Sequence, residues 1–170
     1  MVLVDWEIEN FCSHENNNEP LVTPFDKELV NPASLDIRIG DSAMYDTANG
    51  FDAVNGFHLY DEKHPFYLHP NMFLLVSTLE SFNFPATLSG QIDLKSTVAR
   101  MGLGHSMSGW VDCGFWGVLT LELKNYSEYQ EIPIFPGMRV AQIIFHPHKK
   151  PNKTYKGGKY AGHKTVKSAM

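Results

Sequence analysis

The chain has 170 residues, a length that fits one domain with a sizeable core. Its formal net charge of −5 argues against general nucleic-acid binding by the whole surface, and no stretch reaches the roughly 18 to 20 continuous apolar residues of a membrane-spanning helix. Only Cys12 and Cys113 are present, too few for a disulfide framework or a four-cysteine zinc site. The composition predicts a single domain over residues 1–170 in a reducing cytoplasm, with neither nucleic acid nor a membrane as a partner.

The first segment of the chain has helical periodicity. Over residues 1–13, Val4 and Ile8 share one helical face, and Asp5 is a candidate cap. Acidic residues interrupt this segment and no basic residues precede its apolar ones, so we expect no secretory signal. Residues 14–24 are rich in Asn, Glu and Pro and predict a loop.

Short segments with strand character follow, separated by turns rich in Gly, Pro and Asn. They cover residues 34–40, 66–70, 72–82, 87–94, 117–125 and 139–146. The intervening residues 41–65 are rich in Asp, Asn and Gly and predict a long excursion. This order predicts an all-β sandwich or barrel with little helix.

The strand over residues 117–125 carries one carboxylate inside an apolar pattern. Leu119, Leu121 and Leu123 share one face, so Glu122 points to the opposite face, beside Thr120. A carboxylate at such a position is either a solvated surface group or a functional one. The strand alone does not decide between them.

The stretch KSTVAR, residues 95–100, breaks the strand pattern. As one helical turn it places Ser96 and Arg100 side by side, with unpaired backbone N–H groups at its start that can hold a phosphate. A lone Ser-x-x-x-Arg is a weak signal, because it more often marks a capped turn.

The last 22 residues hold seven of the fourteen basic residues of the chain. They are Lys149, Lys150, Lys153, Lys156, Lys159, Lys164 and Lys167. Two interpretations stand: a solvated end, or a flexible cationic segment that closes on an anionic ligand.

Taken together, these segments resemble a known family. The string KSTVARMGLGHSMSGWVDCGFWGVLTLELKN resembles the nucleotide-site signature of dCTP deaminases, members of the trimeric dUTPase-like superfamily. MVLVDWEIENF is similar to the family's opening helix, NPASLDIRIG to its first core strand and PGMRVAQIIF to its penultimate strand. The resemblance implies a distorted jelly-roll barrel (β-clip) with a short N-terminal helix, a flexible C-terminal lid over residues 148–170, and a homotrimer with sites between subunits.

The resemblance also implies roles for individual residues. Catalytic roles fall on Glu122, as general acid/base, and on Ser96 and Arg100. Nucleotide-binding roles fall on Lys95, Ser96, Thr97, Arg100, Ser108, Gly109, Trp110, Asp112, Thr120, Leu121, Tyr155, Lys159 and His163. We also expect Asp36 and Arg38 to form an ion pair at a subunit contact.

The activity implied is hydrolytic deamination of dCTP to dUTP and ammonia, for which one carboxylate can move the protons. The chain has no C-x-x-C and no H-x-x-x-H, so zinc, which other nucleobase deaminases use, is not expected. Mg²⁺ is expected to bind through the triphosphate, without protein side chains as ligands.

Three alternatives to this activity remain open. One is a bifunctional enzyme that gives dUMP, one is a dUTP diphosphatase, and the third is a non-catalytic nucleotide-binding module. His163, Cys113 and Trp116 depart from the usual family residues, so a modified pyrimidine substrate is also open.

Overall fold

The computed structural model describes residues 1–13, 19–106 and 109–169, so Ser108 of the predicted site lies outside the described residues. The helical elements are α1 (Asp5–Cys12), η1 (Lys27–Leu29), η2 (Phe57–Leu59) and α2 (Ser96–Ala99). The strands are β1 (Val22–Thr23), β2 (Val30–Asn31), β3 (Ser34–Thr47), β4 (Gly50–Ala53), β5 (Phe66–Leu68), β6 (Phe73–Asn83), β7 (Leu88–Leu94), β8 (Leu103–His105), β9 (Trp110–Val111), β10 (Trp116–Asn125), β11 (Ile132–Ile134) and β12 (Arg139–Pro147).

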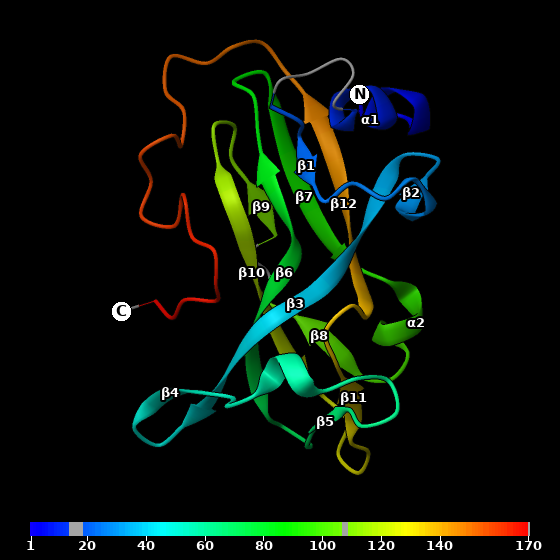
Figure 1. Cartoon of the computed structure of the whole chain (residues 1–170), viewed down its shortest axis with the longest axis vertical. Coiled ribbons are helices and arrows are strands. Elements are labelled where there is room, and N and C mark those ends of the chain that lie inside the picture. The colour runs from blue at the N-terminus through cyan, green and yellow to red at the C-terminus, as the bar shows by residue number, and fades with distance from the viewer. Residues whose placement is uncertain (14–18, 107–108, 170) are drawn as a thin grey trace.

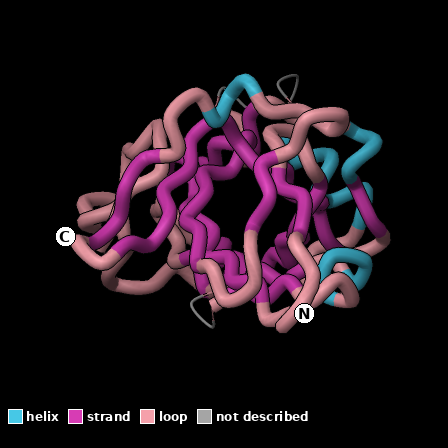
Figure 2. Tube along the Cα trace, turned by 90° about the horizontal axis from the view of Figure 1, so that it is seen from below, coloured by secondary structure: helices cyan, strands magenta, loops and turns pink. Residues whose placement is uncertain are grey.

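Strand β3 is the longest and connects two parts of a curled antiparallel sheet. Its first half pairs with β12, Leu35 opposite Ile143, and its second half pairs with β6, Ala43 opposite Val76. The strand order is β8-β10-β6-β3-β12-β7-β9 (Figure 1). Seen along the strands, the sheet curls around a central core (Figure 2). This confirms the predicted all-β barrel-like fold with a short N-terminal helix.

The core lies inside this curl and follows the period-two alternation of the strands. Ile37, Ile39, Val76, Leu121 and Ile143 are fully buried. Burial of each such aliphatic side chain contributes about 1.5 to 3 kcal/mol. This burial fixes the pairing register of β10, because a slip of one residue would turn its leucines away from the core.

The N-terminal helix begins differently from the prediction. Val4 is the N-cap of α1, and the Glu7 carboxylate accepts a hydrogen bond from the Val4 backbone N–H at 3.0 Å. Asp5 lies inside the helix, where its carboxylate accepts from the Trp6 N–H, so its expected capping role was wrong. No helix among residues 1–13, 19–106 and 109–169 is long and apolar enough to cross a membrane.

The segment predicted as a long excursion, residues 41–65, is more regular than expected. Strand β3 continues through it to Thr47 and turns back into β4, with Tyr45 opposite Asp52. No clear strand signal for β4 is present in the sequence, because Asp, Asn and Gly favour turns. The strand is also short, with only four residues.

The expected ion pair between Asp36 and Arg38 was wrong. The Asp36 carboxylate contacts the Lys95 ammonium at 2.5 Å, and the Arg38 guanidinium contacts Glu80 at 2.8 Å. Residues two apart in a strand share a face, but the distance between them along the strand does not favour an ion pair. Cross-strand neighbours supply the partners instead.

Candidate active site

A cavity of about 480 Å³ opens against the polar face of β10. It is lined by Phe51, Phe73, Leu75, Trp110, Val111, Asp112, Phe115, Val118, Leu119, Thr120, Glu122, Tyr155, Tyr160, His163, Lys167 and Ala169. Six of the predicted site residues are among them: Trp110, Asp112, Thr120, Glu122, Tyr155 and His163. The structure thus gathers in one place residues from a turn, a strand and the C-terminal tail.

Strand β10 presents Glu122 to this cavity. Leu121 and Leu123 are fully buried on the opposite face, as the alternation predicts. Glu122 lies opposite Leu75 of β6, and its carbonyl accepts a hydrogen bond from the Ser106 N–H at 2.9 Å. Because β10 is held by strands on both sides, the carboxylate has a fixed backbone, which general acid/base catalysis requires.

The turn before β10 supplies a second carboxylate. The Trp110 indole N–H donates to Asp112 at 3.1 Å, which fixes the carboxylate at the cavity wall. The Gly109 carbonyl accepts from the Ile92 N–H at 2.8 Å and ties the turn to β7. A carboxylate held in this way can accept a hydrogen bond from a sugar hydroxyl.

The C-terminal tail, residues 148–169 as described, closes the cavity from outside. The Tyr155 N–H donates to the Cys113 carbonyl at 2.8 Å, and the Val118 N–H donates to the His163 carbonyl at 3.0 Å. The Val166 N–H donates to the Ser42 hydroxyl, and the Val166 side chain is buried. The lid expected from the sequence therefore has one buried apolar anchor in its described part.

Trp116 holds the middle of the tail against the edge of β10. Its carbonyl accepts from the Gly162 N–H at 2.7 Å, and a Cβ on Gly162 would lie 2.6 Å from the indole ring. Gly162 also has a φ of +81°, so both the space and the backbone favour glycine there.

Two predicted residues on the same elements do not line the cavity. Lys159 belongs to the tail, but its ammonium donates to the Ala169 carbonyl at 2.6 Å. The Leu121 side chain is buried in the core, so only its backbone could face a ligand.

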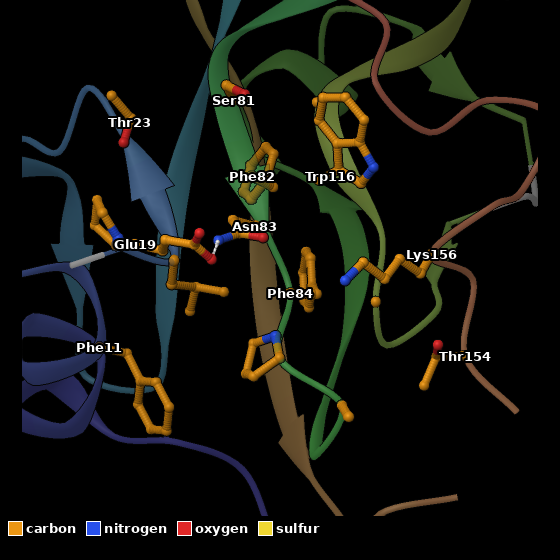
Figure 3. Close-up of a pocket in the computed structure, with 16 residues that line it drawn as sticks. Phe11, Glu19, Thr23, Ser81, Phe82, Asn83, Phe84, Trp116, Thr154 and Lys156 are labelled. Atoms are coloured by element: carbon orange, nitrogen blue, oxygen red, sulfur yellow. Dashed lines mark hydrogen bonds between the residues drawn. The ribbon is translucent and has the colours of Figure 1, made fainter. Parts of the chain in front are cut away.

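A second hollow, of about 840 Å³, is lined by Thr154 and Lys156 of the tail together with residues of other segments. Figure 3 shows Trp116 and Lys156 on one side of it and Glu19 and Asn83 on the other, with Glu19 accepting from Asn83 at 3.3 Å. None of the predicted site residues that the structure describes lines it.

Helix α2 lies away from the cavity. The Arg100 N–H donates to the Ser96 carbonyl at 3.1 Å, so the predicted helical turn is confirmed. Figure 1 places α2 across the sheet from the C-terminal tail, and none of Lys95, Ser96, Thr97 and Arg100 lines the cavity. Within one chain, the predicted phosphate-binding residues and Glu122 are separate.

Comparison with known proteins identifies the family. The family model described as dCTP deaminase-like matches residues 2–148. The chain belongs to this family.

Two relatives show how far the likeness extends. A dUMP-forming dCTP deaminase of Corynebacterium diphtheriae is 35% identical over 153 residues, which cover 84% of this chain and 81% of the relative. A protein of the same name from Aquifex aeolicus is 32% identical over 170 residues, 98% of this chain and 92% of the relative.

Solved structures show the fold of the dCTP deaminase-like family. The dCTP deaminase of Agrobacterium tumefaciens superposes with a TM-score of 0.69 at 22% identity, over 86% of this chain, which spans about half (47%) of that protein. A mutant of the dUTPase from phage phi11 of S. aureus, described with a structural Mg(II) ion, gives a TM-score of 0.51 at 16% identity over 90% of this chain and 94% of that one. The dUTPase-like fold predicted from the sequence is thereby confirmed.

Sequence reasoning missed part of the wall of this dCTP deaminase-like cavity. The rings of Phe51 and Phe73 meet edge-on, with their centroids 5.8 Å apart, and Leu75 lines the same cavity. Lys167 lines it from the tail. Phe51 belongs to β4, inside the excursion to which no strand was assigned. Its aromatic character was the one available signal. No group of three or more His, Cys, Asp or Glu side chains suited to a metal ion occurs in the part of the chain that the structure describes.

His105 of β8 lies close to the same face. Burial lowers the pKa of its imidazole, while the charges of Glu122 and Asp93 oppose this effect and raise it. The net direction is downward, so the imidazole is neutral at neutral pH.

Proposed function

We propose that this protein is a cytoplasmic enzyme that deaminates dCTP hydrolytically, with Glu122 as general acid/base. The observation that carries the proposal is the presence of Glu122, Thr120 and Asp112 in one cavity of a dCTP deaminase-like chain. Thr120 and Leu121 offer backbone groups to the pyrimidine, and Asp112 accepts from the sugar hydroxyl. Tyr155 of the tail covers the nucleoside and excludes water.

The chemistry follows from one carboxylate. Glu122 takes a proton from water as the oxygen attacks C4, and passes it to N3 of the ring. It then moves the remaining hydroxyl proton to the amino group, which leaves as ammonia, so that a C4 carbonyl remains. Each transfer needs the carboxylate within hydrogen-bond reach of the reacting atoms, and the cavity-facing position in β10 supplies this.

We propose that the active enzyme is a homotrimer in which each site combines two chains. The separation of α2 from the cavity supports this, because a second copy can bring Ser96 and Arg100 to the triphosphate of a nucleotide bound beside Glu122. Lys159 of the tail would add positive charge beside the triphosphate when nucleotide is bound.

A complementation experiment tests the shared site. Glu122→Gln and Arg100→Ala each remove one half of the site, and each protein alone should be nearly inactive. Trimers mixed from equal amounts of both should regain about a quarter of the wild-type sites, since each site draws its halves from different chains. Activity measured after co-refolding gives the result, with each variant refolded alone as the control. No recovery in mixed trimers, verified by mass, would contradict a site shared between chains.

We propose that Mg²⁺ enters with the triphosphate and is held by its oxygens. Asp36, a buried carboxylate beside α2, supports this, because both its oxygens already have partners in Lys95 and Asn31. Mg²⁺ would neutralise part of the phosphate charge there.

A second candidate function is the bifunctional reaction that continues to dUMP. It is favoured by the relatives from Corynebacterium diphtheriae and Aquifex aeolicus, both called dUMP-forming. Incubation with dCTP and Mg²⁺ followed by ion-exchange chromatography separates the outcomes. We expect loss of dCTP with equimolar ammonia; a dUTP peak identifies the deaminase and a dUMP peak the bifunctional enzyme. Unchanged dCTP, with dUTP cleaved instead, would identify a dUTP diphosphatase.

A further inference from the structure

The turn that carries Asp112 follows a short strand at the edge of the sheet. Strand β9 has only two residues, Trp110 and Val111, and is the last strand in the order, paired with β7. The Val111 side chain is buried and holds the backbone, but Trp110 is 56% exposed. Two paired residues do not determine the direction of an exposed side chain, so the orientation of the Trp110 indole depends on its other contacts.

One of these contacts is with His146 of β12. The centroids of the indole and imidazole rings are 5.6 Å apart, with an angle of 37° between the ring planes. His146 lies opposite Ser89 of β7. Trp110 lies opposite Gln91, two residues further along β7. Both rings therefore stand on the same face of the sheet and meet across β7, which lies between their strands.

The His146 imidazole has an unsatisfied nitrogen. Its Nε2 is shielded from solvent and has no hydrogen-bond partner among the described residues. The Ser89 hydroxyl, on the strand opposite, lies 3.0 Å from Nε2 of His148 instead. A buried polar atom without a partner costs free energy, so a hydrogen bond from Nε2 does not explain a histidine here. Its packing against the indole remains.

The indole connects this packing to Asp112. The Trp110 N–H donates to one oxygen of the Asp112 carboxylate at 3.1 Å, and both residues line the cavity that contains Glu122. His146 itself does not line this cavity. The contacts thus run from imidazole to indole to carboxylate, and only the last two groups can face a ligand.

We infer that His146 is a positioning residue for the sugar: its imidazole orients the Trp110 indole, which fixes the Asp112 carboxylate toward the sugar hydroxyl. The inference rests on the proposed function for the sugar as the ligand of Asp112. A hydrogen bond depends on direction as well as distance. An indole without its support would leave the carboxylate with several orientations, and restricting them on binding would cost conformational entropy.

Two nucleotides that differ by one hydroxyl test this role. 2′,3′-dideoxycytidine triphosphate (ddCTP) lacks the 3′-hydroxyl of dCTP. The wild type should have a KM for dCTP about tenfold or more below that for ddCTP, because a hydrogen bond to a charged group contributes an effect of this size. His146→Ala should raise the KM for dCTP severalfold, with little change in kcat, and leave the KM for ddCTP unchanged. A general loss of structure would raise both KM values.

Three further variants separate packing from other roles of His146. His146→Phe keeps a flat ring without the unsatisfied nitrogen, so it should retain the preference for dCTP and a Tm at least as high as that of the wild type. His148→Ala is the matched control, since its Nε2 contacts Ser89 instead of the indole, and it should keep the preference. In a Trp110→Ala background, His146→Ala should have no further effect, because the contact through which it acts is gone.

Equilibrium binding of dCTP and ddCTP to the Glu122→Gln protein gives a readout without turnover. A preference for dCTP that His146→Ala removes, in a protein whose wild type does not consume dCTP, would support the inference and contradict the deaminase. Deamination of dCTP with an unchanged preference in His146→Ala would overturn the inference alone. So would a His146→Phe variant that loses the preference as fully as His146→Ala, since a ring nitrogen would then be what matters.

Discussion

Glu122→Gln should lower the rate of dCTP deamination by roughly 10²- to 10⁴-fold, because an amide keeps the shape of the side chain but cannot carry protons between water, ring and leaving group. Binding should change little, since the triphosphate contacts proposed for Ser96 and Arg100 lie outside β10. Ammonia release under saturating dCTP measures the rate, and equilibrium binding measures the affinity.

Lys124→Gln is the matched control for this experiment. Lys124 lies on the same face of β10 as Glu122, two residues on, but does not line the cavity. It should retain most of the activity. A Glu122→Gln enzyme that works at a near wild-type rate would show that Glu122 is a surface residue of the strand, and the proposed mechanism would fail.

Removal of residues 152–170 should nearly abolish turnover while the barrel remains folded. The tail supplies Tyr155, Tyr160 and His163 to the cavity, so its loss opens the nucleoside site to water. Residues 152–169, the described part of this segment, contribute no strand to the sheet, and their backbone hydrogen bonds run mainly to the start of β10 and the turn before it. Ammonia release, circular dichroism and light scattering measure turnover, folding and assembly in turn.

Point variants of the tail give a milder test of the same idea. Gly162→Ala should weaken tail closure, because the added Cβ meets the Trp116 ring at 2.6 Å and the residue has a positive φ. Gly157→Ala adds a Cβ with no atom within 4 Å and should be neutral. Full activity of the truncated protein, or equal behaviour of the two alanine variants, would show that the tail is only a solvated end.

The sequence predicted the parts of the site that depend on local periodicity. The alternation of leucines placed Glu122 on the correct face of β10, and the broken pattern at Ser96 marked a helical turn. Both follow from neighbouring residues alone.

What the sequence did not predict depends on contacts between distant segments. Val166 anchors the tail through Ser42, and Lys95 pairs with Asp36, across separations that no local pattern reveals. A charged residue shows its type in the sequence but not which partner neutralises it.

The pairing of β3 also has a consequence for how the chain folds. Asp36 lies opposite Gln142, so the first half of this central strand, which pairs locally with β2, gains its second neighbour only when the last strand, β12, has been synthesised. Sheets built from such distant pairings fold slowly, because a long loop must close before any contact compensates for the lost chain entropy. Until then this half of β3 keeps one unpaired edge, and a nascent chain stalled before β12 is the species most exposed to aggregation.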